Sequence, residues 1–529
     1  MNKIKILDCT LRDGGYINNW NFGKDNIKKI ITKLEKSNID IIECGFLTKN
    51  IKYDDNCSKF DKIDRICQII EKGHISSLKV CMINYGEYDI DNIPSNKGKY
   101  IDGIRVAFHK KDVEKALEFC KAISSKGYKL FIQPMVSISY SDEEFLDLIY
   151  KVNKIKTYAF YIVDSFGVMK RNDLLRLYYL VDHNLDKDIY VGYHSHNNLQ
   201  LAFSNAQSLV DLKTTRKLII DSCVFGMGRG AGNLNTELFI DYLNNINGSN
   251  YKEQPLLQII DQILAPIYLN NYWGYSLPHY ISAFHNCHPN YASFLDDKST
   301  LTVENINEIL SEMDEKEKNN FNKEYIEKLY NIYQTNTIFD KNVKTELKNI
   351  FKNKSVLIIA PGSSITTEYD KISKLISKKD IISISVNFNP ANYKSDYVFV
   401  SNLRRFETLD NKSDLNLIIT SNIKTKTEKK YIVNYSELLN EIEPVKDNAG
   451  MMLIKLLIKI GVNNIKIAGI DGYSHDVYNN FADKDMAFIK DNTVMDSMNS
   501  GIEKMIVKYS KEVKLEFVTK PKHLKIGDI

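Results

Sequence analysis

The sequence predicts an α/β protein that begins with a barrel of alternating strands and helices and ends with an open α/β sheet. Eight short apolar runs, rich in β-branched residues, alternate with segments of helical spacing over about the first 240 of 529 residues. The runs are apolar on both faces, which is typical of parallel strands covered by helices. Eight strand–helix units of this total length make one (β/α)8, or TIM, barrel.

The predicted strands of the barrel end where such a fold places its active site. The runs are residues 4–10, 39–46, 78–84, 101–108, 129–136, 158–165, 190–196 and 217–226. Between them lie segments with apolar residues at helical spacing, such as DNIKKIITKLEKSN and DVEKALEFCKAISSKG. Catalytic groups of a barrel lie at the carboxyl ends of its strands. The residues that follow these runs are therefore the candidates for chemistry.

The second half of the chain has a different organisation. Residues 251–300 are aromatic and histidine-bearing, whereas residues 301–352 are rich in Glu, Lys and Asn, and we expect the latter to form solvated helices that connect two bodies. A second strand–helix pattern then predicts an open, Rossmann-like sheet. Its strands are expected at residues 355–364, 381–389, 396–402, 415–422 and 464–476. The predicted domains are a barrel at 1–250, the connector at 251–352 and a Rossmann-like domain at 353–529.

Composition favours a cytoplasmic protein with small-molecule substrates. The chain has 71 basic and 67 acidic residues, and its net charge of +4 is too even to indicate nucleic acid or a membrane surface as partner. The eight cysteines include no CxxC pair, which fits reduced thiols. We find no apolar signal region and no run near the roughly 18 apolar residues of a membrane span. The sequence leaves a monomer and a homo-oligomer equally open.

Three strand ends carry residues that suit a divalent metal ion. Arg12 and Asp13 follow the first strand, and the motif HSH places His194 and His196 on one side of the seventh. The eighth strand runs into GMGRGAGNLNTE, where Asn233 offers an amide oxygen. A carboxylate, two imidazoles and an amide suit Mn²⁺, Mg²⁺, Co²⁺ or Zn²⁺. Alternatively, Asn233 caps the next helix, and the glycines bind a phosphate or only permit close packing.

These motifs resemble a known family. TLRDGG, HSHNNLQLA and GAGN are similar to the signature of the barrel metal-dependent lyases and aldolases, which include 4-hydroxy-2-oxovalerate aldolase, 3-hydroxy-3-methylglutaryl-CoA lyase and 2-isopropylmalate synthase. The resemblance covers roughly residues 1–290. It implies metal ligation by Asp13, His194 and His196, with Asn233 as a fourth ligand in the lyase and synthase branches. It also implies that Arg12 faces an enolate oxygen, unless Arg12 is only a salt-bridge partner of Glu43.

Glu43 matches an acidic position of this family near the site, where it either supports the site or contacts the substrate. The resemblance implies cleavage or formation of a C–C bond through the enolate of pyruvate or a similar 2-oxo acid, whose charge a divalent ion and a guanidinium would stabilise. One residue departs from the pattern, because Tyr16 stands where the pyruvate aldolases carry a histidine base. Tyrosine is a poor base near neutral pH. The candidates to replace it are His279, His285 and His288.

The C-terminal domain carries a weaker signal. VLIIAPGSSI ends a strand in a turn that could present N–H groups to an anion, although neither GxGxxG nor GxxxxGK is present. Together with SVNFN and AGIDGYSHD, it resembles the Rossmann-like bacterial sialyltransferases and related glycan proteins, which implies nucleotide contacts by Gly362, Ser363, Ser364 and Asn387. Asp471 or His475 would then act in transfer. The alternative is a degenerate domain used for assembly.

The sequence therefore predicts a metal-dependent aldolase or lyase that acts on a 2-oxo acid and an aldehyde or sugar. Its second domain is expected to take a nucleotide or nucleotide sugar, and the pairing favours a role in surface-polysaccharide biosynthesis. Three alternatives stay open. They are an acyl-CoA-dependent Claisen synthase, a bifunctional protein whose C-terminal domain is a glycosyltransferase, and a non-catalytic binding protein.

Overall fold

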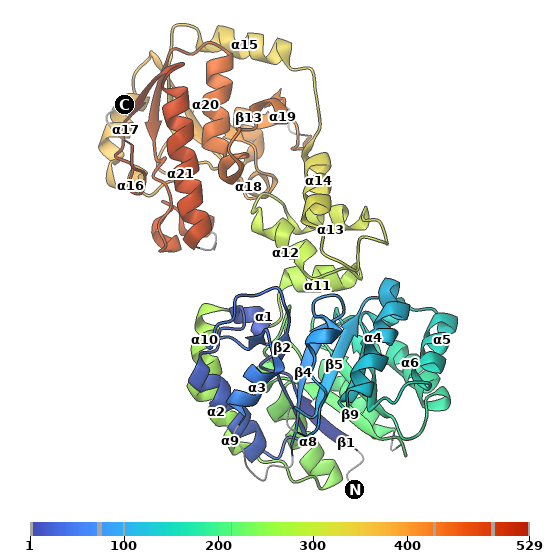
Figure 1. Ribbon diagram of the computed structural model, residues 1–529. Helices are drawn as coiled ribbons and strands as arrows, with labels where there is room; N and C mark the ends of the chain where they lie inside the picture. The colour runs from blue at the N-terminus through green and yellow to red at the C-terminus, as the bar shows by residue number, and fades with distance from the viewer. Residues whose placement is uncertain are drawn as a thin grey trace. The chain divides into compact units, whose positions relative to one another are not determined.

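The computed structural model describes residues 4–70, 77–98, 101–212, 214–426, 430–487 and 492–526. The chain forms two compact units. The first comprises Met1–Ala292 with Asp314–Phe321, and the second comprises Ser293–Met313 with Asn322–Ile529. Each unit contains one parallel sheet and its helices (Figure 1). The division falls within the expected connector, so its aromatic first part belongs with the barrel and most of its later helices belong with the second unit.

The first unit is a closed barrel of eight parallel strands, as predicted. Its strands are β1 (Ile4–Asp8), β2 (Ile41–Leu47), β4 (Leu78–Asn84), β5 (Gly103–Phe108), β6 (Lys129–Pro134), β7 (Ala159–Asp164), β8 (Tyr190–Ser195) and β9 (Leu218–Ser222). They pair in this order, and β1 closes the barrel by pairing with both β9 and β2. A two-residue strand, β3 (Lys59–Phe60), adds to the end of β2 and was not expected.

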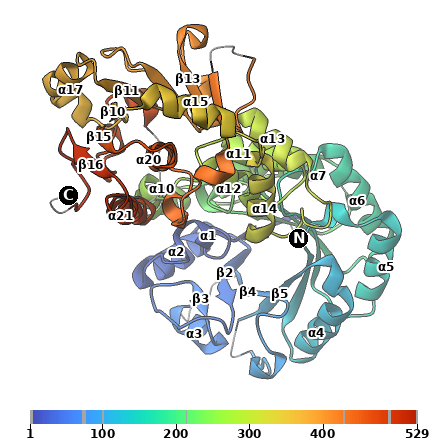
Figure 2. The same ribbon diagram turned by 90° about the horizontal axis from the view of Figure 1, so that it is seen from above.

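Helices surround the barrel, as the view from above shows (Figure 2). They are α1 (Gly15–Asn18), α2 (Lys24–Lys36), α3 (Ile63–Ile69), α4 (Val113–Ser125), α5 (Asp142–Val152), α6 (Arg171–Asn184), α7 (Ala202–Asp211) and α8 (Thr236–Asn247). The chain continues through α9 (Gln254–Ile259), α10 (Ala265–Asn270), α11 (Leu277–Phe284) and α12 (Asn290–Asp297). Their apolar stripes face the strands: α2, for example, buries Ile27, Ile30, Ile31 and Leu34. Among the described helices of the chain, none is long and apolar enough to cross a membrane.

The interior of the barrel is layered, because alternate residues of each strand point inward. The lower inward positions are apolar and include Leu7, Ile41, Phe131, Ala159 and Ile219. Two residues further along β2 and β9, the inward positions are occupied by Glu43 and Asp221, both about 1–2% exposed. Arg105 of β5 is fully buried between them: its Nη1 lies 2.9 Å from Glu43 Oε2, and its Nη2 forms an ion pair with Asp221 Oδ2. We call Glu43, Arg105 and Asp221 the charged layer.

The second unit contains an open sheet of seven parallel strands. They are β10 (Ser355–Ile359), β11 (Ile381–Val386), β12 (Tyr397–Val400), β13 (Leu417–Thr420), β14 (Lys430–Val433), β15 (Asn464–Ala468) and β16 (Lys514–Phe517). The order is β14-β13-β12-β11-β10-β15-β16, so strand addition changes direction at β10. Ligands of open α/β sheets bind at such a switch point. The edge strands β14 and β16 were not predicted, because both are short and carry exposed or partly exposed charges.

Helices of the second unit connect and cover this sheet. They are α13 (Val303–Ser311), α14 (Lys323–Gln334), α15 (Lys341–Phe351), α16 (Ser364–Thr367), α17 (Tyr369–Ile376), α18 (Leu403–Glu407), α19 (Tyr435–Leu438), α20 (Ala449–Lys459) and α21 (Asn492–Tyr509). The most apolar is α20, which buries eight of its eleven residues, seven of them in the main core cluster of this unit. That this domain is Rossmann-like stays a prediction.

Arg105→Met is expected to destabilise the barrel by about 3–5 kcal/mol, because it leaves two carboxylates buried without their shared cation. Both tryptophans of the chain, Trp20 and Trp273, lie in the first unit, so fluorescence during urea unfolding reports on the barrel. The control is Lys151→Met, which removes two surface ion pairs, with Glu114 and Asp147, and should cost less than about 1 kcal/mol. Equal effects of the two substitutions would contradict the structural role of Arg105.

Candidate metal centre and surrounding site

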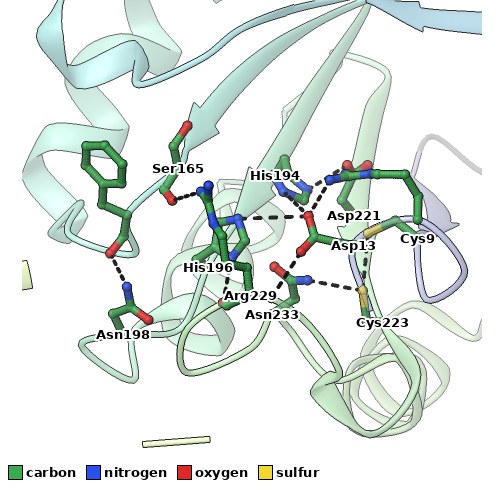
Figure 3. Close-up of polar contacts among 12 residues, drawn as sticks. Cys9, Asp13, Ser165, His194, His196, Asn198, Asp221, Cys223, Arg229 and Asn233 are labelled. Carbon is green, nitrogen blue, oxygen red and sulfur yellow. Dashed lines mark hydrogen bonds and ion pairs between the residues drawn. The ribbon is translucent and has the colours of Figure 1, made fainter. Parts of the chain in front are cut away.

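The four expected metal ligands meet at the carboxyl ends of β1, β8 and β9. Asp13 lies in the turn after β1, where its amide donates to the Cys9 carbonyl at 2.8 Å. Its Oδ2 lies 3.4 Å from His194 Nε2 and 3.9 Å from His196 Nε2. In Figure 3 the Asp13 carboxylate lies between the two imidazoles, with the Asn233 amide beside it. All four side chains are buried.

Hydrogen bonds orient both imidazoles for ligation through Nε2. His194 Nδ1 lies 3.0 Å from Asp221 Oδ2, and His196 Nδ1 lies 3.2 Å from the Arg229 carbonyl oxygen. A proton on each Nδ1 donates to these oxygens and leaves the Nε2 lone pair facing Asp13. Metal-binding histidines are oriented by acceptors of this kind.

Asn233 completes the donor set. Its Nδ2 donates to Cys223 Sγ at 3.2 Å, whereas its Oδ1 is buried and has no hydrogen-bond partner. Buried polar atoms are rarely left unpaired, so this oxygen is explained if it ligates an ion. Gly228 permits the arrangement, because a Cβ there would lie 2.2 Å from Asn233 Nδ2. One carboxylate, two imidazoles and one amide oxygen fit a divalent ion such as Mn²⁺, Mg²⁺, Co²⁺ or Zn²⁺.

The loops that carry these ligands are held together by Asn198. Its Oδ1 accepts from the Ala231 amide at 2.8 Å, and its Nδ2 donates to the Phe166 carbonyl at 2.9 Å. A single buried amide therefore connects the loops that follow β7, β8 and β9. The spacing between the histidines and Asn233 depends on this connection.

Electrostatics favour the metal-binding protonation states of Asp13 and His196 but not that of His194. Burial alone would raise the pKa of Asp13, but the Arg12 guanidinium and the two imidazoles hold it well below its usual value. Burial lowers the pKa of His196 to about 3. Burial also opposes protonation of His194, but Asp13 and Asp221 outweigh it and raise the pKa of His194. A proton and a metal ion thus compete for His194 Nε2.

Arg12 and Glu43 both lie at the site, and each has one buried polar atom without a hydrogen-bond partner. Arg12 Nε donates to Glu43 Oε2 at 2.8 Å, and Arg12 Nη1 forms an ion pair with Asp13. The salt bridge to Glu43 considered from the sequence therefore exists. However, Arg12 Nη2 and Glu43 Oε1 are buried and have no partner. A buried donor and a buried acceptor are left available beside the metal ligands.

The candidate bases lie in different surroundings. Burial raises the pKa of Tyr16, which lies on α1 and packs against Trp20, so its phenolate is even less accessible than usual. Burial and the nearby Arg229 lower the pKa of His288 to about 2, and its Nε2 faces Arg229 Nη1 at 3.3 Å. His279 is on α11, its Nδ1 is buried without a partner, and burial lowers its pKa. His285 ends α11 with its ring against Phe284.

Four residues of the site were missed by the sequence analysis. Asp221 and Arg105 are single charged residues inside the strand runs LIIDSC and GIRVAF, and this isolation is the signal that could have found them. Arg229 stands within the glycine-rich GMGRGAGN, and Asn198 follows HSH. Their partners lie on other strands or in other loops, so their roles become visible only in the fold.

The second unit has its own cavity, of about 190 Å³, where β10, β11 and β15 end. Gly362 and Asn387 line it, as do Arg405, Asn448 and Asn480. The expected anion-binding turn is already occupied. The amide and hydroxyl of Ser364 donate to the Asp471 carboxylate at 2.7 and 2.6 Å.

The other two residues singled out in this unit have partners outside that turn. Ser363 Oγ donates to the Asn479 carbonyl and accepts from Lys522. His475 is more than half exposed and pairs with Asp496 at 3.1 Å. Neither arrangement by itself presents a group for transfer to the cavity.

Comparison with known proteins supports the family resemblance of the barrel. A family model described as HMGL-like matches residues 3–262. A 4-hydroxy-2-oxovalerate aldolase of Roseiflexus castenholzii is 24% identical over 273 residues, which are 50% of this chain and 79% of that protein. An oxaloacetate decarboxylase of Mycobacterium tuberculosis is 24% identical over 240 residues, 44% of this chain and 68% of that protein. A solved structure, the N-terminal domain of a putative aldolase from Bacteroides vulgatus, is 27% identical with a TM-score of 0.48. The match covers 57% of this chain and 98% of that one.

The ligand assignment can be tested by titrating the metal-free protein with Mn²⁺ in a calorimeter. His194→Ala and His196→Ala each remove a ligand and should abolish tight binding. Asp221→Asn should weaken it about 10- to 100-fold, because His194 loses the group that orients it. His183→Ala, on the exposed end of α6, is the control and should bind as the wild type does. Unchanged affinity in a His194→Ala, His196→Ala double variant would contradict the site.

Proposed function

We propose that this protein, whose N-terminal barrel belongs to the HMGL-like family, is a metal-dependent carbon–carbon lyase that works through the enolate of pyruvate or a similar 2-oxo acid. The enzyme class agrees with the family and with the aldolases that it resembles. The substrate class rests on one observation. Beside a donor set for a divalent ion, Arg12 Nη2 and Glu43 Oε1 are both buried and unpartnered, as expected of groups that bind a reacting molecule.

The roles of these side chains follow from their chemistry. A bound divalent ion would act as a Lewis acid toward the keto oxygen of the substrate. Arg12 Nη2 donates to that oxygen as negative charge develops on it, and it needs little reorganisation because Glu43 and Asp13 already hold the guanidinium in place. Glu43 Oε1 is the buried acceptor available for the C3 proton. Tyr16 and His288 are poorer bases, because their pKa values are shifted in the wrong directions.

The pathway is proposed from the second domain. We infer a cytoplasmic role in surface-polysaccharide biosynthesis, with an aldehyde or sugar as the other substrate, because the C-terminal motifs resemble glycan proteins. An acyl-CoA-dependent Claisen synthase is the alternative for the barrel. It would use the same metal and Arg12 but would take its enolate from an acyl thioester.

A second candidate function, binding of a nucleotide or nucleotide sugar, is favoured by the cavity of the second unit. It lies at the switch point of the sheet, where α/β domains bind ligands. The side chains of Asn387, Asn402, Asn448 and Asn480 line it, and amides suit the hydroxyls and base edges of such a ligand. Asp471 occupies the Ser364 turn, so the phosphates would be met by Arg405. Among the described residues, no carboxylate lies within ion-pair distance of Arg405. A glycosyltransferase and an assembly domain remain the alternatives.

The enolising step predicts that the metal-loaded protein exchanges the methyl protons of pyruvate for deuterium without any acceptor. Proton NMR in D₂O follows the loss of the methyl signal. Arg12→Lys should slow exchange about 100-fold or more, because it removes the donor to the developing oxyanion. Glu43→Gln should also slow it, whereas Tyr16→Phe should keep most of the rate.

The control for this experiment is Lys151→Met, on the outer helix α5. A wild type that fails to exchange pyruvate or 2-oxobutyrate, yet releases free thiol from acetyl-CoA in the presence of a 2-oxo acid, would replace the lyase by the Claisen synthase.

The cavity of the second unit predicts nucleotide binding by the full chain. Calorimetry with CMP, UMP and their sugar derivatives should give heat with at least one of them. Arg405→Gln should weaken that binding about tenfold or more, because the cavity loses a cation that has no ion-pair partner among the described residues, whereas the other lining cation, Lys298, is paired with Glu327. Arg404→Gln changes the exposed neighbouring arginine and should have little effect. No binding of any of these ligands would favour the assembly domain.

A further inference from the structure

We propose that Arg229 selects an acceptor substrate that carries an anionic group, a carboxylate or a phosphate, remote from its aldehyde carbon. This inference rests on the proposed function, since it names the class of the second substrate. The metal centre, Arg12 and Glu43 suffice for the 2-oxo acid. Arg229 is a further cation beside them whose presence those roles leave unexplained.

The backbone of Arg229 contacts two of the candidate metal ligands, whereas its side chain extends away from them. The amide nitrogen lies 3.3 Å from Asp13 Oδ1, and the carbonyl accepts from His196. The guanidinium extends toward the end of β7, where Nη2 donates to the Ser165 carbonyl at 2.9 Å. Figure 3 shows this side chain next to His196 and Ser165. The guanidinium is therefore held at the edge of the space into which the metal ligands point.

Arg229 and Arg12 are anchored on opposite sides of the barrel. Arg12 is fixed by Glu43 of β2, and Arg229 by Ser165, which follows β7. In the closed order β1, β2, β4, β5, β6, β7, β8, β9, the strands β2 and β7 stand four places apart, which is half of the circumference. The anchors of the two guanidiniums are thus far apart around the barrel, so a substrate that Arg12 contacts at one end could present its other end to Arg229.

Arg229 has no counter-ion among the residues that the structure describes. Asp13 and Glu43 pair with Arg12, and Asp221 pairs with Arg105. Arg229 instead contacts the Ser165 carbonyl, the His288 imidazole at 3.3 Å and the Tyr16 ring at 5.8 Å. Its Nε is buried and unpartnered. A partly buried guanidinium with a free donor is costly unless an anion binds it, and its planar donors match carboxylate and phosphate.

The reaction itself does not consume this anion. In condensation, C3 of the 2-oxo acid loses a proton to the base and forms a bond to the aldehyde carbon. The electron pair of the aldehyde C=O moves to its oxygen, which takes up a proton and gives a 4-hydroxy-2-oxo acid. Cleavage reverses these steps. Arg229 binds the distal group in either direction, so it is a specificity residue.

The test compares matched acceptors with pyruvate as donor: D-glyceraldehyde against D-glyceraldehyde 3-phosphate, and butanal against succinic semialdehyde. The wild type should prefer the anionic member of at least one pair. Arg229→Gln should lower kcat/KM for that member about 30- to 100-fold and for the neutral member less than about threefold. Arg229→Lys should restore part of the preference. Lys217→Gln, at the opposite end of β9, should leave both values unchanged.

Two further measurements separate this proposal from the proposed function. Arg229→Gln should slow pyruvate exchange without acceptor less than about threefold, far less than its effect on the anionic acceptor. A raised KM for exchange, with acceptor preference intact, would assign Arg229 to the donor carboxylate and overturn the proposal. Binding of glycerol 3-phosphate and succinate, which cannot react, should be lost in Arg229→Gln while Mn²⁺ binding is kept. If the wild type shows no exchange but binds one of these anions through Arg229, the anion site stands and the lyase assignment falls. If the wild type binds neither anion, or if Arg229→Gln binds both as tightly as the wild type does, the proposal is overturned.

Discussion

The candidate metal centre depends on the ion pairs of Arg105 with Glu43 and Asp221, which lie below it in the barrel. Neither carboxylate could be buried in the barrel without a cation, and each carboxylate orients a group of the site above it. Glu43 fixes Arg12, and Asp221 fixes the His194 ring. The two acids come from β2 and β9, on either side of β1. A single planar guanidinium reaches both, with separate donors for each, which the point charge of a lysine could not do as well.

The barrel and its expected ligands were accessible to sequence reasoning because they rest on local patterns. Alternation of strands and helices gave the fold, and HSH follows a period of two, so both imidazoles must lie on one side of β8. The charged layer was not accessible in this way. Arg105 pairs with residues 62 positions before and 116 positions after it, and only the barrel register brings them together. In the second unit, β14 and β16 were missed because both are only four residues long, and in β16 charged residues alternate with apolar ones.

The search for a base shows the same limit. The sequence offered histidines after the barrel, because the synthase branch of the resembled family takes its base from that segment. The fold places His288 against Arg229, where its charged form is strongly disfavoured, and leaves Glu43 Oε1 without a partner instead. The environment of these groups, which residue type does not specify, decides which of them can accept a proton.

Asp471 competes with any free anion for the Ser364 turn of the second unit, and it does so as a permanent part of the chain. Its carboxylate binds the amide and hydroxyl of Ser364, the groups that a phosphate would use in a related turn. A tethered group acts at an effective concentration of about millimolar or more. Free phosphate at lower concentration is therefore outcompeted at this turn by a group that never dissociates from the protein. The turn is thus held by a group of the chain itself, and under the proposed nucleotide binding any selection among ligands would rest with the side chains on the other walls of the cavity.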